Sequence, residues 1–127
     1  MDTDLLVAIL RRKDEARGIV DQLDAAGRQA TTSVNAFELF YGAHKSGQSE
    51  ENVRQTRRIL SRLLVLPLSV STAERAGNIF ATLEKKGRAL DFRDAMIAGI
   101  ALENGLTVVT RNKRDYSRVP GLSIEEW

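Results

Sequence analysis

The chain has 127 residues, of which 43% are hydrophobic and 28% are charged, the composition of an ordinary globular domain. Nineteen Lys and Arg against 17 Asp and Glu leave a net charge of +2, which is too small to indicate nucleic-acid binding by itself. Cys is absent and His44 is the only histidine, which excludes disulfides, Cys-ligated metals and zinc sites that need several histidines. We therefore expect any chemistry to depend on carboxylates.

The first apolar run, Leu5 to Leu10, is too short for a signal-peptide core or a membrane span. No linker, repeat or low-complexity stretch divides the chain. We therefore expect one domain over residues 1–127, located in the cytoplasm and not associated with a membrane.

Hydrophobic periodicity and helix-capping residues predict helices alternating with short strands. In chain order the predicted helices cover residues 4–13, 14–26, 34–45, 49–63, 71–87 and 91–104, and the predicted strands cover 29–33, 64–68, 106–110 and 122–124. Ser71 with Glu74 is interpreted as a capping box that opens the helix ending at Gly87. The helix over 91–104 is apolar around most of its circumference and is expected to be central. The run 106–110 is apolar without alternation, which is typical of a strand buried on both faces.

This order of elements favours an α/β fold with a central, mostly parallel sheet flanked by helices. Ligand sites in such sheets lie at the carboxyl ends of the strands. Acidic residues fall near strand ends and helix starts, and the set is Asp2, Asp4, Glu38, Asp94 and Asp115, with Asn112 beside the last. We expect Asp2, Glu38, Asp94 and Asp115 to converge at one rim of the sheet.

Converging carboxylates repel one another, so a fold accommodates them with a cation or with shifted pKa values. Oxygen ligands without His or Cys suit Mg²⁺ or Mn²⁺. A bound ion of this kind can activate water for attack on phosphorus. The pattern therefore favours metal-assisted hydrolysis of phosphodiester bonds.

A purely structural interpretation of the same acids is also open. The pairs Asn35 with Glu38 and Asp91 with Asp94 have capping-box spacing, in which the acid only satisfies free amides of the helix. The small residues Ala98 and Ala101 favour the functional interpretation for Asp94, because they would leave room beside it for an ion or substrate.

With these residues in this order, the chain resembles PIN-domain ribonucleases, specifically the VapC-type toxins of bacterial and archaeal toxin–antitoxin pairs. The resemblance extends over the whole chain and is carried by four segments in order: MDTDLLVAIL at 1–10, TSVNAFELFYGA at 32–43, DFRDAMIAGIAL at 91–102 and TVVTRNKRDYSRVPGLSIEEW at 107–127. It implies a Mg²⁺-dependent endoribonuclease, with Mn²⁺ as an alternative ion. It further implies a homodimer with an antitoxin segment inserted near the acidic groove.

The resemblance also implies individual roles. Asp2 and Asp94 match the two metal-binding aspartates, Glu38 the helix glutamate and Asp115 the fourth acid. Four other residues match polar positions that support these acids, namely Thr3, which orients the first aspartate, with Asp4, Thr110 and Asn112. One departure from the family pattern is that only Met1 precedes Asp2, where the family normally has several apolar residues.

Basic residues crowd the segment after the strand at 106–110. Arg111, Lys113 and Arg114 would hold RNA phosphates beside the acidic centre, although such runs are also common on solvated surfaces. His44 has no acidic partner in the pattern and is expected to be structural or exposed.

The aromatic residues Phe37, Phe40 and Tyr41 are expected in the core. A low aromatic content of 6% does not indicate a base-stacking platform for single strands.

Two other functions are alternatives for an α/β chain of this size. A phosphoacceptor signalling domain needs an aspartate at the end of a middle strand, and the run LVLPLSV at 64–70 has none. A catalytically silent PIN-fold module that binds RNA or protein stays open as the alternative to the nuclease.

Overall fold

The computed structural model describes residues 30–127. The predicted helices over 4–13 and 14–26 lie outside the described residues, as do Asp2, Thr3 and Asp4.

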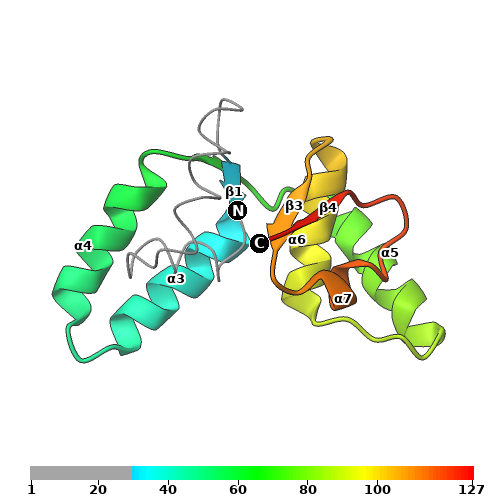
Figure 1. Ribbon diagram of the computed structural model, residues 1–127, viewed down its shortest axis with the longest axis horizontal. Helices are drawn as coiled ribbons and strands as arrows, with labels where there is room; N and C mark the ends of the chain where they lie inside the picture. Colours follow the sequence, from blue (N-terminus) through cyan, green and yellow to red (C-terminus); the bar gives the residue numbers. More distant parts are fainter. Residues whose placement is uncertain (1–29) are drawn as a thin grey trace.

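The described chain alternates short strands with helices (Figure 1). The elements in order are β1 (Ala30–Thr32), α3 (Ser33–Lys45), α4 (Ser49–Leu60), β2 (Leu64–Leu66), α5 (Val70–Lys85), α6 (Phe92–Glu103), β3 (Val108–Thr110), α7 (Lys113–Tyr116) and β4 (Ile124–Glu126). Each predicted element after residue 29 is present, with ends that differ by one to a few residues. The sequence pattern missed one element, the short helix α7.

Both strand pairs of the described part are parallel. β1 pairs with β2, aligning Ala30 with Leu64, and β3 pairs with β4, aligning Val108 with Ile124. All three residues of β3 are buried, as predicted for this apolar run. The α/β class with parallel pairing is therefore confirmed, and between residues 30 and 127 the strands form two separate pairs.

Helices α3 and α4 lie side by side at one end of the molecule in Figure 1, and α5, α6 and α7 lie at the other end with β3 and β4. α3 contacts α6, which joins the two parts. Among residues 30–127, no helix has the length and apolar character needed to cross a membrane.

The predicted central position of α6 is confirmed. Ala95 and the run from Ile97 to Ala101 are buried within a core that also includes Leu83, Val108 and Tyr116. At Gly99 the helix approaches α5 very closely, because a Cβ placed there would lie 3.1 Å from the Ala76 Cβ and 3.1 Å from the Thr72 carbonyl oxygen. Only glycine allows this spacing without a shift of the neighbouring helix.

Helix α5 begins earlier than the sequence pattern predicted, so the Ser71–Glu74 capping box is wrong. Ser69 is the N-cap, with extended backbone, and its Oγ accepts a hydrogen bond of 3.2 Å from the amide of Thr72. Ser71 is then already inside the first turn, and Glu74 lies beyond the turn that a capping acid can reach.

The capping interpretation of Asn35 and Glu38 is also wrong. Thr32 caps α3, and its Oγ1 accepts from the amide of Asn35 at 3.1 Å. The Asn35 side chain is fully buried, and its Oδ1 accepts from the hydroxyls of Thr32 at 2.8 Å and Thr31 at 3.3 Å. Asn35 thus joins β1 to α3, and Glu38 lies in the second turn of the helix.

We expect Gly99→Ala to lower the free energy of unfolding by about 1–3 kcal/mol, because the added methyl overpacks the contact between α5 and α6. Gly77 is the matched control, since it is helical and exposed and an added Cβ would meet nothing within 4 Å. Gly77→Ala should leave stability unchanged or raise it by up to about 1 kcal/mol through helix propensity. Urea denaturation measures both, and equal effects of the two variants would contradict close packing at Gly99.

Candidate active site

Three charged residues, Asp91, Arg93 and Asp94, lie close together at the start of α6, and Asp94 is the one predicted as a site residue. Asp91 is the N-cap, and its Oδ1 accepts from the amide of Arg93 at 2.8 Å. Asp94 follows within the first turn and is half-buried. Asp94 thus lies near the start of the helix predicted over 91–104, and Asp91 is its cap.

A buried tyrosine holds Asp94. The hydroxyl of Tyr116, whose side chain is fully buried, donates to Asp94 Oδ1 at 3.2 Å. This bond connects α6 to α7, which follows β3. Ala98 and Ala101, which were expected to leave room beside Asp94, are buried in the core cluster that includes Tyr116.

The polar residues after β3 form a chain of hydrogen bonds. Thr110 is fully buried, and its Oγ1 accepts from the amide of Asn112 at 2.9 Å. The Asn112 side chain then donates to Asp115 Oδ2 at 2.9 Å. Arg118 lies 3.4 Å from Asp115 Oδ1 and donates to the carbonyl of Ala89 at 2.7 Å. Both carboxylate oxygens of Asp115 therefore have partners in its own segment of the chain, Asn112 and Arg118.

Arg93, which was not among the predicted site residues, links two of the acidic segments. Its guanidinium donates to Asp91 through two bonds of 3.1 Å, and Nη1 lies 3.6 Å from Glu38 Oε2 on α3. These side-chain hydrogen bonds from Arg93 lower the pKa of Asp91, and the same bonds, with the charge of Glu38, raise the pKa of Arg93. An arginine between two aspartates in the stretch DFRD was the available signal.

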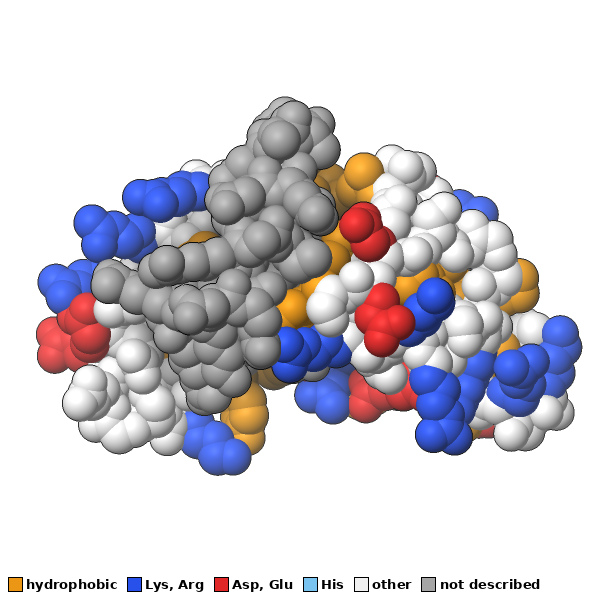
Figure 2. Space-filling view, in the orientation of Figure 1, with side chains coloured by type: hydrophobic (Ala, Val, Ile, Leu, Met, Phe, Trp, Pro, Cys, Tyr) orange, Lys and Arg blue, Asp and Glu red, His pale blue; other side chains and the backbone are white. Residues whose placement is uncertain are grey.

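The basic residues of this region differ in their surroundings. The Arg111 guanidinium lies 3.8 Å from the centre of the Trp127 ring, so its plane is taken up by a cation–π contact. Lys113 and Arg114 on α7 are exposed. Figure 2 shows Lys and Arg side chains over several parts of this face rather than in one continuous patch.

The prediction that the aromatic residues of α3 belong to the core is wrong for two of them. Phe37 is 64% exposed and Tyr41 58% exposed, and their rings stack with centroids 6.3 Å apart. Phe40 is half-buried, and His44 is exposed as expected. The 3–4 spacing of these residues gave the helix correctly but not which of its faces is covered.

The described residues contain part of the predicted acidic centre. Arg93 joins Glu38 to the first turn of α6, and Tyr116 joins Asp94 to the segment that carries Asp115. Between residues 30 and 127 no three His, Cys, Asp or Glu side chains are close enough to hold a metal ion. Asp2 lies outside the described residues. The described donors are the carboxylate oxygens of Glu38, Asp94 and Asp115, all three half-buried, and this chemistry fits a hard divalent ion.

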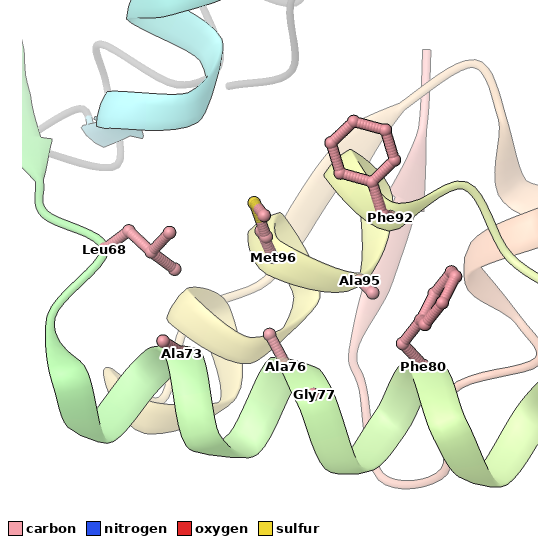
Figure 3. A pocket seen from close by; sticks show the side chains of 8 residues that line it. All are labelled: Leu68, Ala73, Ala76, Gly77, Phe80, Phe92, Ala95 and Met96. Atoms are coloured by element: carbon pink, nitrogen blue, oxygen red, sulfur yellow. The ribbon is translucent and has the colours of Figure 1, made fainter.

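A separate pocket lies between α5 and α6. Figure 3 shows side chains of both helices around it, with Leu68 at its edge, and its volume is about 170 Å³. Its lining consists of apolar residues and a glycine, so it offers no group for hydrolysis.

Comparison with known proteins shows the family of the chain. The PIN-domain family model matches residues 1–122. This chain belongs to the PIN-domain family. Within the family, a tRNA(fMet)-specific endonuclease VapC from Salmonella typhimurium is 37% identical over 127 residues, covering 100% of this chain and 96% of the relative. One of the same name from Shigella flexneri is 41% identical over 101 residues, covering 80% and 76%.

A solved structure of the family has the same fold. The crystal structure of VapBC2 from Rickettsia felis bound to a DNA fragment from their promoter matches with a TM-score of 0.89 and 31% identity, covering 99% of this chain and 96% of that one. The resemblance to VapC-type PIN domains stated from the sequence is therefore confirmed.

We expect Tyr116→Phe to lower the free energy of unfolding by about 1 kcal/mol, because it removes the hydroxyl that donates to Asp94 while keeping the buried ring. Tyr41→Phe, which alters an exposed hydroxyl, is the matched control and should have no measurable effect. A double-mutant cycle with Asp94→Asn isolates the pair. Additive effects in that cycle would mean that Tyr116 does not act on Asp94.

Proposed function

We propose that this chain is the toxin of a type II toxin–antitoxin pair and acts as a metal-dependent endoribonuclease in the cytoplasm. The observation that carries the proposal is its full-length similarity to the Salmonella tRNA(fMet)-specific endonuclease VapC. Nucleases of the VapC group generally depend on a divalent metal. The initiator tRNA is accordingly the first RNA to assay.

The proposed centre uses Asp2 and Asp94 to hold Mg²⁺ or Mn²⁺, with Glu38 and Asp115 completing the acidic set. When bound, the ion supplies an activated water and stabilises charge at the phosphorus. Tyr116 orients the Asp94 carboxylate by its hydrogen bond, and Asn112 orients that of Asp115.

Supporting residues are proposed on both sides of this centre. The Thr110 hydroxyl positions Asn112 by accepting a hydrogen bond from the Asn112 backbone amide. This contact favours the assignment of both as supporting residues. Thr3 and Asp4 are proposed to do the same for Asp2.

The proposed RNA-binding residues are Arg111, Lys113 and Arg114. Lys113 and Arg114 are exposed next to the segment that carries Asp115, so their cations can reach phosphates on either side of a scissile bond. Arg111 would contribute its charge from above the Trp127 ring.

The proposed partners are the RNA substrate, a cognate antitoxin and a second copy of the chain. The fold of this chain matches a structure of VapBC2, which supports the antitoxin. The family match over residues 1–122 supports one PIN domain over residues 1–127.

We expect Asp94→Asn to abolish cleavage of initiator tRNA in Mg²⁺, because it removes a ligand charge at the proposed ion. Excess EDTA should have the same effect on the unaltered protein. Glu103→Gln, at the other end of α6, is the matched control and should cleave normally, since Glu103 pairs with Arg75 away from the site. Gel analysis of the RNA measures both. Cleavage that survives EDTA would refute the metal-dependent mechanism, and no cleavage by the unaltered protein would favour the silent binding module.

We expect Lys113→Ala and Arg114→Ala each to weaken RNA binding and to reduce the slope of log affinity against log salt by about 1, as for the loss of one phosphate contact. Arg57→Ala, an exposed arginine on α4, removes the same charge elsewhere and should leave the slope unchanged. The assay is filter binding in EDTA, so that no cleavage occurs. Equal slopes for all four proteins would mean that Lys113 and Arg114 belong to an ordinary solvated surface and contact no phosphate.

A further inference from the structure

Arg93 is held in place by two segments of the chain. Asp91, two residues earlier, accepts hydrogen bonds from both Nε and Nη2 of Arg93, each at 3.1 Å, and this pair of bonds fixes the plane of the guanidinium. Its remaining terminal nitrogen, Nη1, lies 3.6 Å from Glu38 of α3. The next residue in the chain is Asp94. One cation therefore lies among three carboxylates, two of which belong to the proposed catalytic set.

We propose that Arg93 is a positioning residue that holds Glu38 beside the first turn of α6 and whose positive charge weakens binding of the divalent ion at Asp94. The proposal rests on the proposed nuclease function. It assigns two effects to one side chain, and these have opposite signs. The contact with Glu38 favours cleavage, whereas the charge opposes binding of another cation.

The geometry separates this role from ordinary surface pairing. Exposed ion pairs contribute little to stability, and the Arg93 side chain is 45% exposed. We therefore expect its ion pairs to contribute little to folding stability. Arg75 provides a comparison in the same molecule, because it pairs with Glu103 across α5 and α6 at 3.4 Å and is 46% exposed. The two arginines share chemistry and exposure, but only Arg93 lies near Asp94.

The charges around Asp94 determine whether removal of Arg93 strengthens or weakens binding of a divalent ion. Arg93 interacts with the charges of Asp91, Glu38 and Asp94 together, so removing it makes the surroundings of Asp94 more negative. A divalent cation is then attracted more strongly, by about threefold in affinity for one charge at close range under physiological salt. Glu38 at the same time loses its contact with α6.

The test uses the full-length variants Arg93→Gln, Arg93→Lys and Arg75→Gln. Binding of Mn²⁺ without RNA is measured by electron paramagnetic resonance, and kcat and KM for RNA cleavage are measured at saturating Mn²⁺. Arg93→Gln should bind Mn²⁺ about threefold more tightly and yet have a kcat about tenfold lower with little change in KM. Arg93→Lys keeps the charge, so its Mn²⁺ affinity should match the unaltered protein and its kcat should be partly restored. Arg75→Gln should change neither quantity.

Specific outcomes would overturn the proposal. Unchanged or weaker Mn²⁺ binding by Arg93→Gln would contradict the proposed charge effect. An unchanged kcat would contradict the proposed positioning of Glu38. Equal effects of Arg75→Gln would show a general loss of surface charge. Absence of RNA cleavage by the unaltered protein would refute the nuclease function and the positioning role together, whereas the Mn²⁺ titration decides the charge effect independently. Thermal melting of all variants confirms that they are folded.

Discussion

The close contact between α5 and α6 at Gly99 is the constraint on which the rest of the structure depends. Because an added Cβ would lie only 3.1 Å from Ala76, α6 cannot rotate or shift without disturbing α5. The run from Ile97 to Ala101, which includes Gly99, is buried and fixes the same helix in the core. The first turn, with Asp94, is therefore presented at a fixed place by packing that involves no catalytic residue.

Each described acid of the proposed centre has a side-chain partner. Tyr116 donates to Asp94, Arg93 pairs with Glu38 across two helices, and Asn112 donates to Asp115. The N-terminus of α6 adds a favourable dipole for the acids of its first turn. These contacts reduce the repulsion that gathered carboxylates would otherwise experience, and they also restrict the side chains to defined orientations.

The sequence predicted the features that depend on local pattern. The apolar run before Arg111 gave β3, and the apolar circumference of 91–104 gave the central helix, because burial follows directly from such patterns. The start of α5 at Ser69 was missed because two serines two residues apart offer competing caps, and only the extended backbone decides between them. The exposure of Phe37 and Tyr41 depends on which face of α3 is covered, which spacing alone does not contain.

The candidate site was predictable as a set of residues and not as a set of contacts. Asp94 stands out because it lies in the first turn of a helix, and Asn112 because it follows a strand, whereas the role of Arg93 depends on the approach of α3 to α6. A difference between the needs of the core and those of the site explains how a structure with 31% identity superposes with a TM-score of 0.89. The core needs apolar residues of suitable size, and many sequences supply them. The described acids lie outside that core, so the surrounding charges can change while the fold is kept.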